Sequence, residues 1–353
     1  MIPAMPVSPR SCFTGVLVFL GSVTTAQPAS PTPAPKTPPA IRLPFTALVP
    51  ESAIPLAAAS DFAATDDALW IASRAGGDVT RIDAKTNAAA PKLSIGNDLC
   101  AGATADFDGL FLPRCPAGVI ARIDTKTNAP GVSIAAPIHE RGRSMAAGIG
   151  SLWVIADSRG TIARIDPVAN AVVAEIHTDP GASDLAFGEG ALWVANPEKN
   201  TVTRVNPHNN LIVKTIPVAG GPVGLAAGEG AIWTWNRTDG SLSRINAVEN
   251  KVEATIKPGL GSGDARIAAG EGSIWISRPG ATLSRVDPRT NHVAQIFTGL
   301  ASGAITVAHG SIWLAVSSTT VWRLDPRRIE ATRVPTPPRQ ASPTPKPTPS
   351  SAP

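Results

Sequence analysis

Charged residues are scarce in this 353-residue chain: Asp, Glu, Lys and Arg together make up 16% of it. No block of Lys or Arg occurs, no basic run is interleaved with aromatic residues, and no Cys/His spacing matches a zinc finger. The net charge of +4 is too small to indicate a nucleic-acid partner, so we expect none. Apolar residues account for 43% of the sequence, which is enough to bury a core and argues against a disordered chain.

Long apolar runs are also absent, and the best apolar stretch lies near the N-terminus. It extends from Cys12 to Leu20, after Arg10 and before the small residues Val23 to Ala26. The stretch is about half the ~20 residues that a membrane-spanning helix needs. We therefore predict a cleaved secretory signal peptide over residues 1–26, no transmembrane segment after cleavage, and a periplasmic or secreted mature protein.

Cysteine occurs three times. Cys12 lies in the predicted signal peptide, which leaves Cys100 and Cys115 as an even pair. In an oxidising compartment, such a pair predicts a disulfide. A metal site is the poorer alternative, because two sulfurs alone cannot fill a tetrahedral metal shell, and we expect no metal site.

Helical periodicity is absent throughout, and the sequence instead repeats itself about every 40 residues. One aromatic residue in each copy sets the register: Trp70, Phe111, Trp153, Trp193, Trp233, Trp275 and Trp313. A triplet of arginine, an apolar residue and Asp or Asn follows about ten residues later in each copy. The triplets begin at Arg81, Arg122, Arg164, Arg204, Arg244, Arg285 and Arg323. The aromatic residue and the arginine triplet keep the same spacing in all seven copies. The sequence therefore predicts seven copies of one structural unit.

Each unit is predicted to hold four short strands, which the copy starting at Gly224 places at residues 224–227, 231–236, 241–246 and 251–257. Gly228 to Gly230 gives a tight turn that needs positive φ. An Asp-Pro-x-x-Asn sequence such as Asp166 to Asn170 closes the last hairpin, because Asp, Pro and Asn each favour their turn position. Four-stranded units of this length stack around an axis as a propeller. We predict an all-β fold, a seven-bladed β-propeller of four-stranded blades, with the tryptophans in its core and the triplet arginines in structural contacts.

Two Pro/Thr/Ser-rich tracts flank the predicted propeller of residues 41–335. Residues 27–40 are predicted to be an extended linker and residues 336–353 a disordered tail, because neither can bury apolar surface. Four strands for each of the seven units can be found between residues 62 and 334. Residues 42–49 then look like one more outer strand. We expect this strand to pair with the last blade as a latch and so close the ring. Residues 329–334 would then be displaced from the outer-strand position or added outside it.

The units from Gly188 and Gly270 resemble the YVTN-type propeller repeat and the repeat of the virginiamycin B lyase (streptogramin lyase) family, and the resemblance covers residues from about 55 to 334. For a lyase, the resemblance implies that a cyclic depsipeptide ester is opened by elimination with Mg²⁺. The family places a Glu-x-His pair in a loop entering a blade and a further Glu at the end of the next second strand. The second strands of this sequence end without a carboxylate, and the one histidine in a blade-to-blade loop, His139, is followed by Glu140. We expect no catalytic residue, and no cofactor unless the lyase alternative brings Mg²⁺.

Arginine gathers in the loops before each first strand and after each second strand, which a four-stranded blade places on one face of the ring. Guanidinium groups bind carboxylates and phosphates through bidentate contacts, so this face is a candidate anion-binding mouth, with a merely solvated charged rim as the alternative. Cys100 and Cys115 lie in the same loops of the second unit, where antiparallel pairing brings strand ends together. The candidate ligand-binding residues are Arg74, Arg114, Arg143, Asp157, Arg159, Asn196, Asn236, Arg237, Arg266 and Arg278.

These features favour an exported, monomeric binding or scaffold propeller. Its Arg-rich channel face would take an anionic small molecule, a glycan or a protein partner in the cell envelope. An enzyme of the streptogramin lyase type is the alternative. A third hypothesis is a surface-displayed module whose Pro-rich tails engage cell-wall material.

Overall fold

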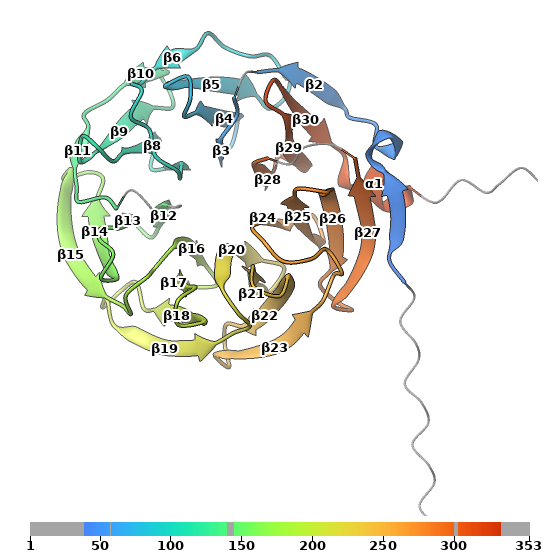
Figure 1. Cartoon of the computed structure of the whole chain (residues 1–353). Helices are drawn as coiled ribbons and strands as arrows, with labels where there is room; N and C mark the ends of the chain where they lie inside the picture. The colour runs from blue at the N-terminus through green and yellow to red at the C-terminus, as the bar shows by residue number, and fades with distance from the viewer. Residues whose placement is uncertain (1–38, 57, 140–144, 300–302, 333–353) are drawn as a thin grey trace, which may run out of the picture. The chain divides into compact units, whose positions relative to one another are not determined.

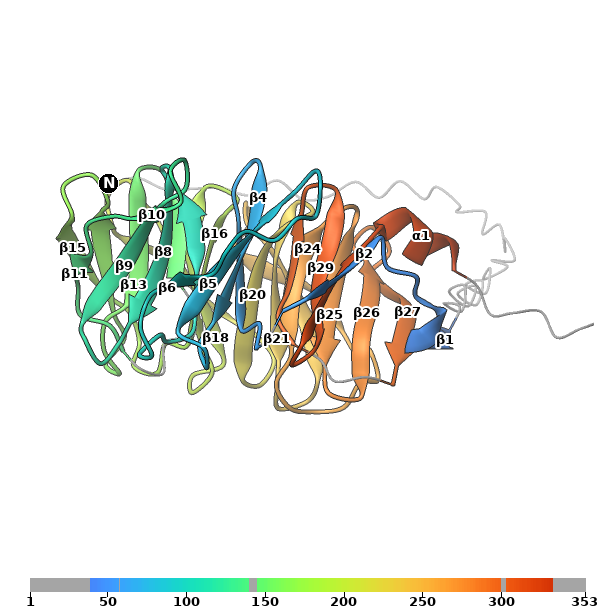
Figure 2. The same cartoon turned by 90° about the horizontal axis from the view of Figure 1, so that it is seen from above.

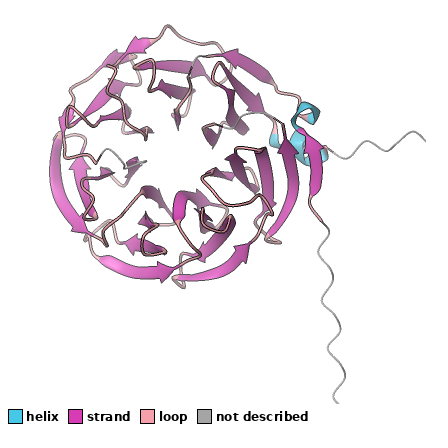
Figure 3. Cartoon of the chain, viewed as in Figure 1, coloured by secondary structure: helices cyan, strands magenta, loops and turns pink. Residues whose placement is uncertain are grey.

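The predicted fold class is confirmed: in the computed structural model, seven β-sheets form a ring (Figure 1). The structure describes residues 39–56, 58–139, 145–299 and 303–332. The predicted signal peptide, most of the predicted linker and the predicted tail lie outside these residues. Strands dominate the described part of the chain (Figure 3), and no helix in that part is long and apolar enough to cross a membrane.

The sheets are numbered as blades 1 to 7 in chain order, and the strands of each run from the central channel outward. Blade 1 consists of β3 (Asp61–Ala64), β4 (Ala68–Ser73), β5 (Asp78–Asp83) and β6 (Leu93–Ser94). Blade 2 consists of β7 (Thr104–Asp106), β8 (Gly109–Arg114) and β9 (Val119–Asp124), with β10 (Ala129–Pro130) and β11 (Ile134–Ala135) both paired to β9. Blade 3 consists of β12 (Met145–Gly148), β13 (Ser151–Ile155), β14 (Thr161–Asp166) and β15 (Ala171–His177). Blade 4 consists of β16 (Asp184–Gly188), β17 (Ala191–Asn196), β18 (Thr201–Val205) and β19 (Ile212–Pro217).

Blade 5 consists of β20 (Pro222–Gly228), β21 (Ala231–Asn236), β22 (Ser241–Asn246) and β23 (Lys251–Ile256). Blade 6 consists of β24 (Arg266–Gly270), β25 (Ser273–Arg278), β26 (Ala281–Asp287), β27 (His292–Thr298) and β1 (Ile41–Pro44). Blade 7 consists of β28 (Ile305–Ala308), β29 (Ser311–Ser317), β30 (Thr320–Leu324) and β2 (Ser52–Pro55). The described helices are a 3₁₀ turn, η1 (Phe45–Ala47), and one short α-helix, α1 (Pro326–Ala331).

The hairpin turns follow the chemistry read from the sequence. Between β20 and β21, Glu229 and Gly230 both adopt positive φ, at 54° and 70°, which is the geometry of a type I′ turn. Between β14 and β15, the Asp166 carboxylate accepts hydrogen bonds from two backbone N–H groups, and Asn170 has a φ of 53°. In both hairpins the turn residues adopt the geometry that the sequence predicts.

The core lies between neighbouring blades and is built on the second strands. Six of the register tryptophans are at most 1% exposed, and Phe111 fills the equivalent place in blade 2. The indole of Trp233 donates to the Gly228 carbonyl at 3.1 Å, as Trp193, Trp275 and Trp313 do to the equivalent carbonyls. The predicted core role of the tryptophans is confirmed.

The triplet arginines tie blades together. In five blades, the guanidinium lies over the ring of its own register aromatic, 5.1 to 5.8 Å from the centroid. It also donates to the outer turn of the next blade: Arg204, for example, reaches the Ala247 carbonyl at 2.5 Å and Asn250 Oδ1 at 2.8 Å. Arg323 makes the same contact from blade 7 to blade 1, at Ala84 and Asn87, so the chain of contacts spans the joint of the ring.

Ring closure differs from the expectation. The strand that completes blade 7 is β2, antiparallel to β30, whereas β1 adds to blade 6 as a fifth strand parallel to β27 (Figure 2). The latch therefore exists, but its predicted position at residues 42–49 is wrong. Of the stretch 329–334, which the latch prediction had as displaced or added outside, residues 329–331 lie in α1 and form no outer strand, because Asp325 caps that helix by accepting the Arg327 N–H.

Candidate functional site

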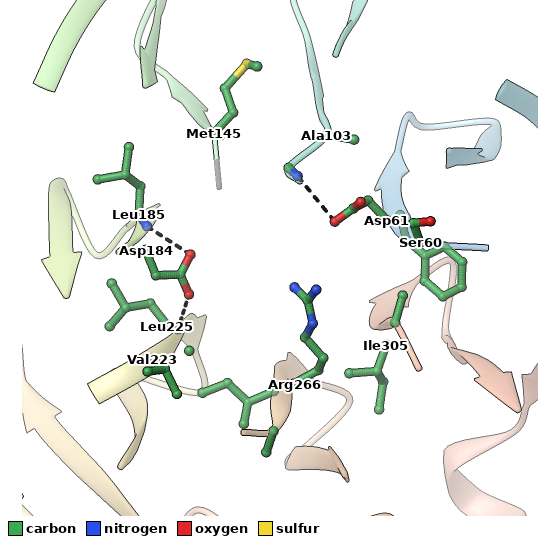
Figure 4. Close-up of a pocket in the computed structure, with 16 residues that line it drawn as sticks. Ser60, Asp61, Ala103, Met145, Asp184, Leu185, Val223, Leu225, Arg266 and Ile305 are labelled. Carbon is green, nitrogen blue, oxygen red and sulfur yellow. Dashed lines mark hydrogen bonds between the residues drawn. The ribbon is translucent and has the colours of Figure 1, made fainter. Parts of the chain in front are cut away.

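Two adjacent cavities lie on one face of the ring, here called the top face, which carries the loops entering each first strand and the loops after each second strand. The larger, here called the mouth cavity, has a volume of about 880 Å³ and is lined by loops of blades 1 to 6, including Arg74, His139 and Arg237. The smaller, here called the channel cavity, has a volume of about 170 Å³ and is lined by the beginnings of all seven first strands (Figure 4). Val223 and Arg266 line both cavities, so the two cavities adjoin at these residues.

Most of the predicted arginines on the top face are neutralised by a carboxylate. The ion pairs are Arg74–Asp61 at 3.4 Å, Arg114–Asp98 at 2.6 Å, Arg159–Asp157 at 2.7 Å and Arg237–Asp264 at 4.0 Å. Since each of these guanidinium charges has an acidic partner, the four pairs add little net positive potential to the face.

The pKa values of two of these carboxyls reflect their partners. The hydrogen bond from Arg114 lowers the pKa of Asp98 below its ordinary value. Burial acts to raise the pKa of Asp157, but hydrogen bonds from Arg159 and Thr161 outweigh it and bring the pKa to about 2. Both carboxyls are therefore ionised at neutral pH, and the pairs on the rim persist there.

Arg266 is the exception among the predicted arginines. It is the first residue of β24, and its backbone pairs with Ser277 of β25. Its half-buried side chain extends into the channel cavity (Figure 4). Within the described residues, its guanidinium has no ion-pair or hydrogen-bond partner. One cation in the channel thus keeps its charge and its five N–H donors available.

Three other predicted residues hold loops in place and line neither cavity. Arg278 is 9% exposed, stacks over Trp235 and donates to three carbonyl oxygens, of Leu260, Gly261 and Ser262. The Asn196 amide donates to the carbonyls of Asp179 and Pro180. The Asn236 amide donates to the hydroxyls of Ser241 and Ser243. Arg143 lies outside the described residues. Of the nine predicted residues that the structure describes, the mouth cavity brings together Arg74, Arg237 and Arg266.

Two acidic residues of the channel cavity were not predicted. Asp61 and Asp184 open the first strands of blades 1 and 4, at positions equivalent to Arg266 in blade 6. Each carboxylate accepts a backbone N–H from the next blade, at Gly102 (3.3 Å) and Leu225 (2.9 Å) respectively. The sequence does contain a signal for these two residues: they are charged at a position where other units carry a small residue, such as Gly102, Gly224 or Ala304.

The predicted disulfide between Cys100 and Cys115 is present, with a Cα–Cα distance of 5.9 Å. It joins the loop that enters β7 to the loop that follows β8, and both cysteines line the mouth cavity. The nearby Arg114–Asp98 pair ties the same two loops. The wall of the cavity at blade 2 is therefore fixed both covalently and electrostatically.

The chain resembles several solved propellers in structure. Virginiamycin B lyase from Staphylococcus aureus superimposes with a TM-score of 0.67 at 18% identity, over 78% of this chain and 98% of that one. A catalytically inactive variant of the same lyase with quinupristin gives 0.64 at 17% identity, over 78% and 99%. Hydrazine synthase of Kuenenia stuttgartiensis gives 0.62 at 13% identity, over 77% and 97%. The sequence matches no protein-family model and no curated protein. At these identities, the likeness establishes the shared propeller fold and leaves the activity open.

The top-face residues that the structure describes do not form the Mg²⁺ site that the lyase resemblance implies. No group of three or more His, Cys, Asp or Glu in the described part of the chain is arranged to hold a metal ion. Asp61 and Asp184 in the channel already accept backbone N–H groups. His139 lines the mouth cavity, whereas Glu140 beside it lies outside the described residues. We derive no catalytic step through a metal from this site.

Proposed function

We propose that this chain is an exported binding protein that takes a small anionic molecule into its top-face cavities, with Arg266 as the anchor. The observation that carries the proposal is a half-buried guanidinium that extends into a cavity without a partner among the described residues (Figure 4). Burying a charge without a partner is costly, so a ligand that brings a carboxylate or a phosphate is strongly favoured there.

The dimensions of the two cavities support a small ligand. Ligand pockets commonly measure about 300–1,000 Å³, and the mouth cavity falls in that range. The paired arginines on the rim, Arg74 and Arg237, add donors at the same mouth. A metabolite or a sugar acid fits this arrangement better than a large flat partner, because Arg266, which has no partner among the described residues, lines the channel cavity as well as the mouth cavity.

Export is proposed from the sequence together with the disulfide. The apolar stretch of residues 12–20 favours secretion, and disulfides persist in oxidising compartments. The Cys100–Cys115 bond at the mouth suits a protein that works in the periplasm or outside the cell.

The test uses the disulfide-bonded protein of residues 27–353 in thermal-shift and calorimetric titrations against phosphate, citrate and glucuronate. A ligand at 100 times its dissociation constant that binds only the folded state adds about 2.7 kcal/mol of stability.

We expect Arg266→Gln to weaken binding at least tenfold, because charge-assisted hydrogen bonds are lost. Arg159→Gln is the matched control, since its guanidinium is on the same face, 84% exposed and outside both cavities. An equal loss in both variants would mean nonspecific attraction and would refute the proposed site.

A lyase of the streptogramin type is the second candidate, and the similarity to the lyase structure with quinupristin favours it. Incubating the protein with quinupristin and Mg²⁺, followed by mass spectrometry, tests this candidate directly. Elimination opens the ring without adding water, so the product keeps the mass of the substrate and is recognised by its retention time and fragmentation. Turnover that exceeds that of an Arg266→Gln/His139→Ala variant would replace the binding proposal by catalysis.

A further inference from the structure

The arginines of the top face divide into two groups by the hydrogen bonds that their guanidinium groups make. In the first group, Arg114 donates to the Asp98 carboxylate at 2.6 Å. Arg159 donates to the Asp157 carboxylate at 2.9 and 2.7 Å. Arg278 donates to three backbone carbonyl oxygens. The protein itself uses the donors of these three arginines, and none of the three lines the mouth or the channel cavity.

The second group consists of Arg74, Arg237 and Arg266, and all three line the mouth cavity. Their guanidinium groups donate no hydrogen bond to any residue that the structure describes. Asp61 and Asp264 lie 3.4 and 4.0 Å from the first two guanidinium groups, so they balance the charge without accepting an N–H. A guanidinium carries five N–H donors. The mouth cavity is therefore lined by three arginines whose donors the described residues leave unfilled.

A third cavity shows that two of these arginines border a common space. It has a volume of about 310 Å³ and is lined by loops of blades 1, 6 and 7. Arg74 and Arg266 line this cavity as well as the mouth cavity. Arg237, in the loop after β21, lines the mouth cavity from blade 5. Donors from three blades are thus presented to one space of about 880 Å³.

Hydrogen-bond acceptors are also present in the lining of the mouth cavity. Asn97 and Glu198 line it with exposed side chains that hydrogen-bond to no described residue, so both can accept from a hydroxyl group. Among the described residues of the lining, none is Phe or Trp, and the sequence contains no tyrosine. A flat aromatic acid would therefore find no large ring to stack on, whereas a hydroxylated ring would find both donors and acceptors.

We infer that the mouth cavity binds a sugar acid, with its carboxylate on Arg266 and its ring hydroxyl oxygens accepting from Arg74 and Arg237. The inference rests on the proposed function and names the class of ligand for that same site. A carboxylate suits Arg266, because that guanidinium has no acidic partner among the described residues. Hydroxyl oxygens suit the other two arginines, because a neutral acceptor fills their donors without placing a second negative charge beside Asp61 or Asp264.

The experiment compares three probes by calorimetry on the wild-type, disulfide-bonded protein of residues 27–353. Glucuronate has a hydroxylated ring and a carboxylate, cyclohexanecarboxylate has the ring and the carboxylate without hydroxyls, and glucose has the hydroxyls without the carboxylate. We expect glucuronate to have a Kd at least about tenfold lower than either of the other two.

The outcomes separate the sugar acid from the proposed function. Equal affinities of glucuronate and cyclohexanecarboxylate would overturn the sugar acid and leave the proposed anion site intact, as would binding of phosphate or citrate without glucuronate. Equal affinities of glucuronate and glucose would overturn both, because the carboxylate would then contribute nothing. No binding by any of these probes would also overturn both.

The variant Arg237→Met tests the hydroxyl contacts, and the half-exposed position of Arg237 makes the change compatible with folding. We expect the ratio of the cyclohexanecarboxylate and glucuronate dissociation constants to fall by about threefold, because hydrogen bonds to hydroxyls are lost. The Kd of cyclohexanecarboxylate should not change. Arg159→Met is the matched control, since its guanidinium is 84% exposed and lies outside both cavities, and it should leave the ratio unchanged. An unchanged ratio in Arg237→Met would contradict the assigned hydroxyl contact.

Discussion

Arginine plays three different roles in this molecule, and its surroundings decide which one. On the third strands, it is stacked on an aromatic ring and hydrogen-bonded to the next blade, as Arg204 is over Trp193. On the top-face rim, it is exposed and ion-paired, as Arg159 is with Asp157. At the start of β24, Arg266 has neither kind of partner among the described residues. The same side chain is thus a tie between blades, a solvated pair or a candidate ligand anchor.

Arg204→Leu tests the tie between blades 4 and 5. The change removes two hydrogen bonds and a cation–π contact, and it leaves the Ala247 carbonyl and Asn250 Oδ1 without their donor. Losing one partner of a part-buried polar contact costs about 1–3 kcal/mol, so we expect a loss of this size in urea unfolding. Arg289→Leu is the control, because its side chain is 86% exposed and should change stability by less than ~0.5 kcal/mol. Equal losses in the two variants would contradict the tie.

The repeated residues could be predicted from the sequence, and the individual site residues could not. The register tryptophans and the triplet arginines recur seven times, so their structural roles follow from the period alone. Arg266 has no such mark, because the sequence does not show that Asp61 pairs with Arg74 or Asp98 with Arg114. Which arginine lacks a carboxylate depends on distances between blades, so the sequence alone could not single out Arg266 among the ten candidates.

At the scale of elements, local turn chemistry was read correctly and the position of the closing strand was not. The predicted second and third strands of the unit at Gly224 match β21 and β22. The outer strand of blade 2 is split into β10 and β11, where Pro130 lacks a backbone N–H for a longer ladder. The closing strand was misplaced because β1 and β2 are both four residues long with the same burial pattern. The two strands differ in their pairing partner and in their direction relative to it.

The disulfide is the element-scale feature that most directly holds the mouth cavity. It closes a loop of 15 residues, for which the chain-entropy relation gives about 3 kcal/mol. We expect Cys100→Ala/Cys115→Ala to lower the midpoint of thermal unfolding by several degrees in non-reducing buffer. Adding a reductant should lower the wild-type midpoint to that of the variant, and it should not change the variant. A wild-type midpoint that does not respond to complete reduction would show that the bond adds nothing to stability.

At the scale of the whole molecule, the ring is joined by non-covalent contacts between blade 7 and its neighbours in space. β2 brings Ile54 against β30, Arg323 donates to Ala84 and Asn87 of blade 1, and His309 contacts the Thr65 carbonyl at 2.7 Å. A linear array of repeats has stability that is summed over neighbours, so damage at one end stays near that end. A closed ring has no free end. Weakening its joint should therefore lower the stability of every blade.

Ile54→Ala tests whether closure couples the blades. Ile54 is 4% exposed, and truncating such a buried isoleucine costs about 2–5 kcal/mol. Hydrogen exchange should show the same loss of protection in β13 of blade 3 and β17 of blade 4 as in β29 of blade 7, because slow amides in a cooperative ring exchange through global unfolding. Val49→Ala, at a side chain that is 67% exposed in the same N-terminal segment, should leave protection unchanged. Loss confined to blades 7 and 1 would mean that the blades unfold independently, and that the mouth cavity could open locally without unfolding the rest of the ring.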